Sequence, residues 1–249
     1  MMRRYYSQTG EDALAWSVFQ DRPTGFFVEV GAFDGRHGSN SLSFEEAGWI
    51  GICVEPHPDY AGICRANRPG STCIRAACVG PGHGPTVRFL SEPLGVLSGI
   101  NAHETPGLPE RYGLRSMTFP GFSEIEVTAR TLDDIIAEHH AGLSEIDWLS
   151  IDVEGTEIDV MRGLSIPARV ICAEANTDPA RDELKAFMAS CGYVYATSLS
   201  QNYFFSVDES TANTLASASF DITTELTQHP LGPQATVANH SGQRIRRVP

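Results

Sequence analysis

Short runs of consecutive apolar residues alternate along the chain with segments that have helical periodicity. Residues 26–30 and 49–54 are almost wholly apolar and lie between turn signals, which is typical of buried strands. Helical segments at 41–47 and 58–66 follow these two runs, and a third strand is predicted at 71–79. The order strand, helix, strand, helix, strand is typical of βαβ units on a parallel sheet.

The second half of the chain repeats this alternation. The pattern predicts strands at 124–129, 146–151, 168–173, 193–197 and 202–207, and helices at 10–19, 131–140, 157–162 and 179–190. The last two strands are expected to close the sheet as an antiparallel pair. We therefore predict an α/β fold, an open sheet of about seven mostly parallel strands with helices on both faces.

Two stretches fall outside this alternation. Residues 91–123 are irregular and rich in Gly and Pro, and loops of this length inside a domain are commonly lids over a site. We predict one main domain over residues 1–210, with a lid insertion at about 91–123. Residues 211–249 are predicted to be a C-terminal extension that is partly disordered, in which the basic run Arg244–Arg247 is solvated.

Composition narrows the class of protein. The 249 residues are 41 % hydrophobic and 20 % charged, which is ordinary for a globular protein. The 18 basic and 31 acidic side chains give a net charge of −13, which disfavours a nucleic-acid partner. Apolar runs are far shorter than the ~18 residues that a membrane span needs. No secretory signal is expected, because no apolar stretch follows the basic residues near the start.

The cysteines indicate the redox environment of the protein, and the scarcity of lysine argues against two kinds of site. None of the six cysteines forms a C-x-x-C pair and most lie in apolar segments, so we expect buried, reduced thiols and a cytoplasmic location. Lys185 is the only lysine, and its segment is predicted to be an exposed helix face. A Walker A phosphate site is therefore excluded, and Schiff-base chemistry is disfavoured.

A glycine turn follows the first predicted strand. Glu29, Gly31 and Asp34 lie at the carboxyl end of this strand, where open α/β sheets bind ligands. Phe33 stands where the dinucleotide fingerprint G-x-G-x-x-G has its second glycine, so a pyrophosphate ligand is disfavoured. The acidic side chains would repel phosphate and attract a sulfonium or an ammonium group. A tight strand–helix turn without a ligand is the alternative interpretation.

Glu55 follows the second strand, 24 residues after Gly31. An acidic side chain at this place can accept hydrogen bonds from both hydroxyls of a ribose. Together the two features indicate a nucleoside that carries a positive charge. An exposed carboxylate at a strand end is the alternative for Glu55.

Further carboxylates follow two later strands. Asp152, Glu154 and Glu157 come after the strand at 146–151, and Glu174 comes after the next strand. Carboxylates crowded at one sheet edge share a cation or raise one another's pKa, and both outcomes suit acid–base chemistry. Acids that complement a helix N-terminus are the alternative, which explains Glu157 but not Asp152.

Five stretches occur in an order shared with a known family. They are YSQTGED at 6–12, GFFVEVGAFDG at 25–35 with Ser39 and Asn40, GW to VEPHP over 48–58, TLD at 131–133, and IDWLSIDVEGTE at 146–157. Over roughly residues 5–207 the chain resembles the FkbM family of S-adenosylmethionine-dependent methyltransferases. The resemblance implies the class I methyltransferase (Rossmann-like) fold with strand order 3-2-1-4-5-7-6. It also implies O-methylation of a hydroxyl on a small molecule, a sugar or a natural product, with S-adenosylmethionine as cofactor.

The same resemblance implies a set of cofactor-binding residues. The set is Gln8, Glu29, Gly31, Ala32, Asp34, Ser39, Asn40, Glu55, Pro56, Ala76, Ala77 and Asp152. In this arrangement Glu55 binds the ribose hydroxyls, the two alanines flank the adenine, and Asp152 lies near the sulfonium and the incoming hydroxyl.

A hydroxyl acceptor must also lose its proton. Asp152 and Glu154 are the predicted catalytic residues, as general bases. Alternatively, a divalent cation such as Mg²⁺, held by Asp152 and Glu174, would acidify the hydroxyl. His57 and His103 are the other candidates for the base, although a lone histidine is more often structural.

The cofactor motifs leave other functions open. They fit methylation of a nitrogen or a carboxyl group, and they fit a non-catalytic module that binds S-adenosylmethionine. A nicotinamide oxidoreductase is disfavoured by Phe33 and by the acidic side chains around the glycine turn. The expected partner is a small-molecule or glycan acceptor, with neither nucleic acid nor membrane, and the sequence leaves the oligomeric state open.

Overall fold

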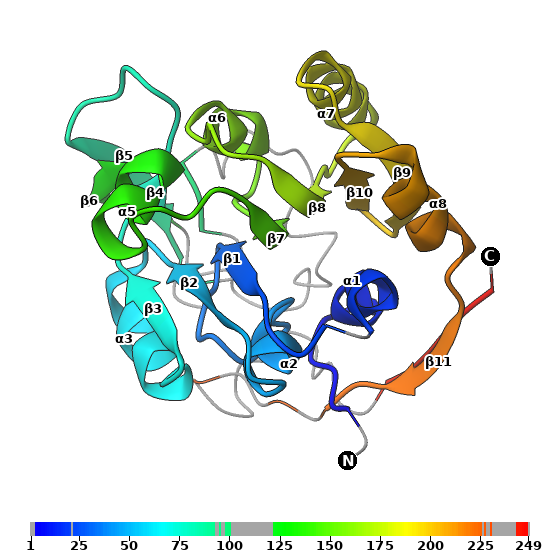
Figure 1. Ribbon diagram of the computed structural model, residues 1–249. Coiled ribbons are helices and arrows are strands. Elements are labelled where there is room, and N and C mark those ends of the chain that lie inside the picture. Colours follow the sequence, from blue (N-terminus) through cyan, green and yellow to red (C-terminus); the bar gives the residue numbers. More distant parts are fainter. Residues whose placement is uncertain are drawn as a thin grey trace.

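A seven-stranded sheet forms the centre of the protein (Figure 1). The computed structural model describes residues 3–20, 22–92, 95, 98–100, 122–225, 227, 230 and 243–248. The strands lie in the order β3 (Ser71–Ile74), β2 (Ile50–Val54), β1 (Phe26–Val30), β7 (Ile146–Ile151), β8 (Ala168–Glu174), β10 (Asn202–Ser206) and β9 (Val194–Leu199). Neighbouring strands are parallel except around β10, which runs antiparallel to β8 and β9. Counted along the chain within this sheet, the order is 3-2-1-4-5-7-6, which confirms the predicted fold.

Helices cover both faces of the sheet, because its strands present apolar side chains on both sides. Phe27 of β1 and Trp148 of β7 face one apolar layer, and Val28 and Leu149 face the other. The first layer is covered by α1 (Glu11–Phe19), α2 (Leu42–Glu45), α3 (Pro58–Asn67) and α8 (Glu209–Ser217). The second is covered by α5 (Leu132–His139), α6 (Glu157–Arg162) and α7 (Asp178–Ser190). Among the described residues, no helix is both long and apolar enough to cross a membrane.

A second, three-stranded sheet lies beside the first. It consists of β4 (Ala77–Cys78), β6 (Ser123–Arg130) and β5 (Thr86–Ser91), in that order. The strand predicted at 71–79 is therefore two strands, because the chain leaves β2 after Ile74 and pairs with β6 from Ala77 onward. β5 was not predicted from the sequence pattern. Most of the predicted lid, residues 93–94, 96–97 and 101–121, lies outside the described residues.

The end of the chain differs from the prediction at its basic run. Arg244–Arg247 forms β12, which pairs antiparallel with β11 (Phe220–Thr223) instead of being a solvated end. The pairing is favoured because Arg244 forms an ion pair with Asp221 at 2.7 Å and Arg247 donates a hydrogen bond to the Thr197 hydroxyl at 2.9 Å. Within the extension predicted at 211–249, residues 226, 228–229, 231–242 and 249 lie outside the described residues.

Trp148 connects the sheet to the loop after β1. Its side chain is fully buried between the rings of Phe44 and Phe204, with centroid distances of 6.0 and 6.1 Å. Its Nε1 donates a hydrogen bond to the carbonyl oxygen of Asn40 at 2.9 Å. The largest side chain of the central strands therefore also fixes the backbone of a loop at the end of the sheet.

We expect the variants W148F and W148A to separate these two roles. W148F removes the donor from a partly buried carbonyl and should lower the free energy of unfolding by about 1–3 kcal/mol. W148A also leaves a large cavity and should cost about 3–5 kcal/mol. Urea denaturation followed by circular dichroism measures both, and a W148F variant as stable as the wild type would show that the hydrogen bond contributes nothing.

Candidate functional site

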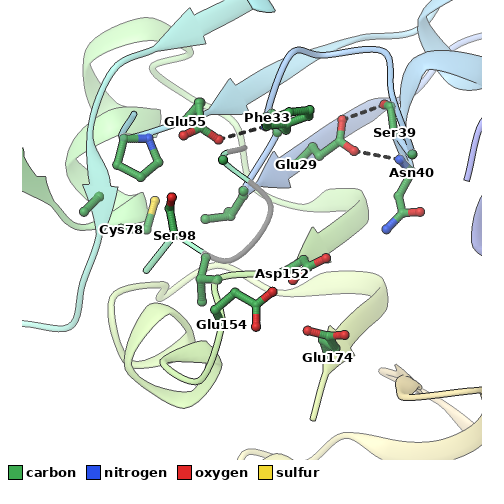
Figure 2. Close-up of a pocket in the computed structure, with 18 of the residues that line it drawn as sticks. Glu29, Phe33, Ser39, Asn40, Glu55, Cys78, Ser98, Asp152, Glu154 and Glu174 are labelled. Carbon is green, nitrogen blue, oxygen red and sulfur yellow. Dashed lines mark hydrogen bonds between the residues drawn. The ribbon is translucent and has the colours of Figure 1, made fainter. Parts of the chain in front are cut away.

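An open cavity lies at the carboxyl ends of β1, β2, β7 and β8, and part of it is drawn in Figure 2. Its volume is about 1270 Å³, including the part that is open to solvent. With the exception of Asp34, every residue predicted to bind the cofactor lines this cavity, and so do Glu154 and Glu174. The structure therefore gathers residues that lie far apart in the sequence around one space.

The glycine turn lets two strands approach closely. Gly31 has a φ of 83°, and a Cβ added to it would lie 1.8 Å from the carbonyl oxygen of Asp152. Two non-glycine residues at the cavity, Phe33 and Glu154, also have positive φ values of 49° and 59°. Such strained backbone persists where surrounding contacts hold it, and it concentrates at functional sites.

Glu55 holds the turn from the neighbouring strand. Its Oε2 accepts a hydrogen bond from the backbone N–H of Phe33 at 2.8 Å, and its Oε1 accepts one from the N–H of His57 at 2.7 Å. Burial raises the pKa of Glu55 to about 7, against the two backbone hydrogen bonds, which lower it. Each carboxylate oxygen keeps a second lone pair for a ligand in the cavity.

Glu29 anchors the loop at 39–41. It accepts hydrogen bonds from the Ser39 hydroxyl at 2.9 Å, the Asn40 backbone N–H at 2.6 Å and the Ser41 hydroxyl at 2.6 Å. Two of these contacts are visible in Figure 2. The carboxylate thus orders this loop, whatever further contact it makes with a ligand.

Arg68 provides the positive charge beside Glu29 and was not predicted from the sequence. Its side chain is fully buried, and its guanidinium lies 3.1 Å from Glu29 and 2.7 Å from Glu45. It also donates to the Gly35 carbonyl at 3.2 Å and the Ser41 hydroxyl at 2.8 Å. Nothing in its sequence position after α3 distinguishes it from an exposed arginine.

Three carboxylates from β7 and β8 form a cluster. Oxygen atoms of Asp152, Glu154 and Glu174 lie within 4.8 Å of one another. Asn176 donates hydrogen bonds to Glu174 at 2.9 Å and to Glu154 at 3.3 Å. Burial, with the charges of Asp152 and Glu154, holds the pKa of Glu174 well above its usual value. Oxygen ligands so arranged could hold a divalent cation such as Mg²⁺.

Two predicted residues turn away from the cavity. Asp34 is buried, and its Oδ1 accepts hydrogen bonds from the backbone N–H groups of Arg36 and His37, so it shapes the loop. His57 is the N-cap of α3, where its Nδ1 accepts from the N–H of Asp59 at 3.3 Å, and it does not line the cavity. His103 lies outside the described residues.

The cavity has further walls that the sequence did not indicate. Glu11 of α1 accepts a hydrogen bond from the Asn202 amide of β10 at 2.8 Å, and both residues line the cavity. On the other side Cys78, Phe89 and Ile100 form an apolar wall next to the alanines predicted to flank the adenine. A contact between residues 191 positions apart has no signal in a single sequence.

Comparison with known proteins identifies the family. A sequence model described as the Methyltransferase FkbM domain matches residues 29–195. The chain belongs to the FkbM methyltransferase family. It is thus an S-adenosylmethionine-dependent methyltransferase, as its sequence motifs indicated. A search of curated proteins finds no match.

Solved structures with a similar fold are distant in sequence. A precorrin-6y C5,15-methyltransferase from Geobacter metallireducens is 11 % identical with a TM-score of 0.39, covering 87 % of this chain and 78 % of that one. An O-methyltransferase from Bacillus cereus in complex with SAH is 13 % identical with a TM-score of 0.37, covering 78 % of each chain. A putative RNA methyltransferase from Pyrococcus horikoshii is 11 % identical with a TM-score of 0.40, covering 79 % of this chain and 83 % of that one. Such scores are too low to carry any argument about the acceptor.

We expect R68A to be strongly destabilising, because it leaves the buried Glu29 carboxylate without its counter-charge. Breaking a buried ion pair by removing one partner costs about 3–5 kcal/mol. The matched control is R65A in the last turn of α3, since Arg65 is exposed and should contribute within about 0.5 kcal/mol. Denaturation in urea compares the two variants, and a loss as small as that of R65A would contradict the proposed anchoring of the loop.

Proposed function

We propose that this FkbM methyltransferase transfers the methyl group of S-adenosylmethionine to a hydroxyl of a small molecule, a sugar or a natural product. One observation carries the proposal. One cavity is lined by the glycine turn and Glu55 and also by the carboxylates of Asp152, Glu154 and Glu174. Figure 2 draws these acids around one space, which supports a base within reach of a cofactor bound there.

The charge of the cavity supports binding of a sulfonium. Its described lining contains six carboxylates and neither lysine nor arginine: Glu11, Glu29, Glu55, Asp152, Glu154 and Glu174. Clustered negative charge with low-dielectric walls attracts a cation. Within this cavity we assign the ribose hydroxyls to Glu55, the amino-acid end to Ser39 and Asn40, and the adenine to the wall at Ala76 and Ala77.

The reaction needs alignment and a proton acceptor. The hydroxyl oxygen attacks the methyl carbon, the bond from that carbon to sulfur breaks, and its electron pair stays on sulfur. The hydroxyl proton passes to a carboxylate. Asp152 is the proposed acceptor because its backbone lies directly against Gly31 of the glycine turn, and Glu154 and Glu174 are the nearest alternatives.

The same carboxylates argue against an amine acceptor. A cluster of negative charge raises the pKa of an ammonium group, and a protonated amine has no lone pair to attack the methyl carbon. A neutral hydroxyl becomes a better nucleophile beside the cluster, because a carboxylate removes its proton.

A second route to the same activity is a divalent cation bound by Asp152 and Glu174, which would lower the pKa of the hydroxyl.

We expect the affinity for S-adenosylhomocysteine to fall as the pH is lowered, if Glu55 binds the ribose hydroxyls as an anion. The pKa of Glu55 is about 7 in the cofactor-free protein, so protonation competes with binding below that pH. Linkage of one proton predicts a dissociation constant about tenfold higher at about pH 6 than at about pH 7.5. Isothermal titration calorimetry measures it. E55Q should bind weakly with a flat pH profile, and an unchanged slope in E55Q would exclude Glu55 as the group responsible.

We expect D152N to lower kcat by about 10²–10⁴-fold, because an amide cannot accept the hydroxyl proton. The assay is transfer of labelled methyl from S-adenosylmethionine to a panel of polyhydroxylated acceptors. D182N is the matched control, since Asp182 is an exposed acid on α7. If D152N, E154Q and E174Q all turn over at the wild-type rate, the carboxylates have no part in the reaction.

Two further results separate the alternatives. If the cation route operates, a chelator abolishes turnover and added Mg²⁺ restores it, whereas a carboxylate base is insensitive to both. A non-catalytic module would bind S-adenosylhomocysteine and methylate nothing in the panel.

A further inference from the structure

Three cysteines that are remote in sequence meet behind the cofactor cavity. Cys53 is on β2, Cys73 is directly opposite it on β3, and Cys64 is on α3, which packs over these strands (Figure 1). The sulfur atoms of all three lie within 4.8 Å of one another, and those of Cys64 and Cys73 are 3.7 Å apart. None of the three lines the cavity.

We propose that Cys53, Cys64 and Cys73 bind a soft divalent cation, Zn²⁺, as three thiolate ligands. Zinc–sulfur bonds of about 2.3 Å in a tetrahedral site place sulfur atoms about 3.8 Å apart, close to the separation observed here. Sulfur ligands select Zn²⁺ over Mg²⁺, whereas the carboxylate cluster in the cavity has the opposite preference. The two clusters are therefore distinct sites for chemically different cations.

The surroundings of the cluster suit a buried thiolate site. The side chain of Arg68 lies next to the Cys64 sulfur, since a Cβ added to Gly35 would lie 2.7 Å from Arg68 Cγ and 2.9 Å from Cys64 Sγ. Three thiolates with Zn²⁺ carry a net charge of −1, which one buried arginine can offset. A monovalent cation would leave −2 beside the same arginine, so a divalent cation is favoured.

Access and the fourth ligand come from the edge of the sheet. β3 is an edge strand, and Cys73 is half-buried, while Cys53 and Cys64 are buried. A metal ion can enter on the Cys73 side, and a water molecule can complete the tetrahedron there.

The site would support the cofactor loop rather than take part in the reaction. Cys53 lies two residues before Glu55 on the same chain segment. A Cβ added to Gly35 would lie 2.9 Å from the Cys64 sulfur, so the glycine turn rests directly on this cluster. A cation here would join β2, β3 and α3 beneath the turn.

The test measures metal content and thiol chemistry in the full-length protein. Protein purified under reducing conditions should contain about one zinc per chain by mass spectrometry. C73S should lose it, and C191S, at an exposed cysteine outside the cluster, should keep it. Metal-free protein titrated with Cd²⁺ should develop a cadmium–thiolate absorption band that saturates at one equivalent, with the band reduced by C73S and unchanged by C191S.

A second measurement needs no variant. Zn²⁺ should slow alkylation of Cys73 by iodoacetamide at least tenfold while leaving Cys191 unaffected, as read from peptide masses. Absence of zinc together with absence of the cadmium band overturns the proposal. Equal alkylation of Cys73 with and without Zn²⁺, or a Cys64–Cys73 disulfide in the protein under reducing conditions, also overturns it.

Discussion

The buried ion pair between Arg68 and Glu29 is the interaction on which the cofactor loop depends. A carboxylate at the end of β1 could not remain charged in an apolar core without a counter-charge, and Arg68 provides it at 3.1 Å. Once charged, Glu29 orders Ser39, Asn40 and Ser41 through direct hydrogen bonds. The loop that faces the cavity therefore owes its shape to a cation that never reaches the cavity.

The main sheet could be predicted from the sequence because each central strand is a short apolar run between turn signals. β1, β7 and β8 are buried on both faces and carry no competing periodicity. The small sheet could not be predicted in the same way. β4 has only two residues and continues directly from the β3 region, and β6 alternates without showing which partner it pairs with. Whether a segment forms a strand is decided mainly by its own residues, whereas the strand it pairs with depends on residues far away in the sequence.

The residues of the cavity also divide into those that could be predicted from the sequence and those that could not. Gly31, Glu55 and Asp152 were identifiable because carboxyl ends of parallel strands converge, so strand order alone brings them together. Arg68 and the cysteine cluster depend on how α3 packs on β2 and β3, and intervals of 11 and 9 residues between the three cysteines match no metal motif. Contacts set by the angle of a helix on a sheet leave no pattern in the sequence.

Burying carboxylates around the cavity costs folding free energy, and a positively charged ligand offsets this cost. The folded state raises the pKa of Glu55 to about 7, and that of Glu174 well above its usual value, mainly through burial. Between the unfolded and folded pKa values the native protein binds more protons than the unfolded chain, so these groups make the fold less stable as the pH rises. A bound sulfonium reverses that balance, because it favours the ionised carboxylates. The positive charge of S-adenosylmethionine therefore offsets part of the free energy that burying these acids costs.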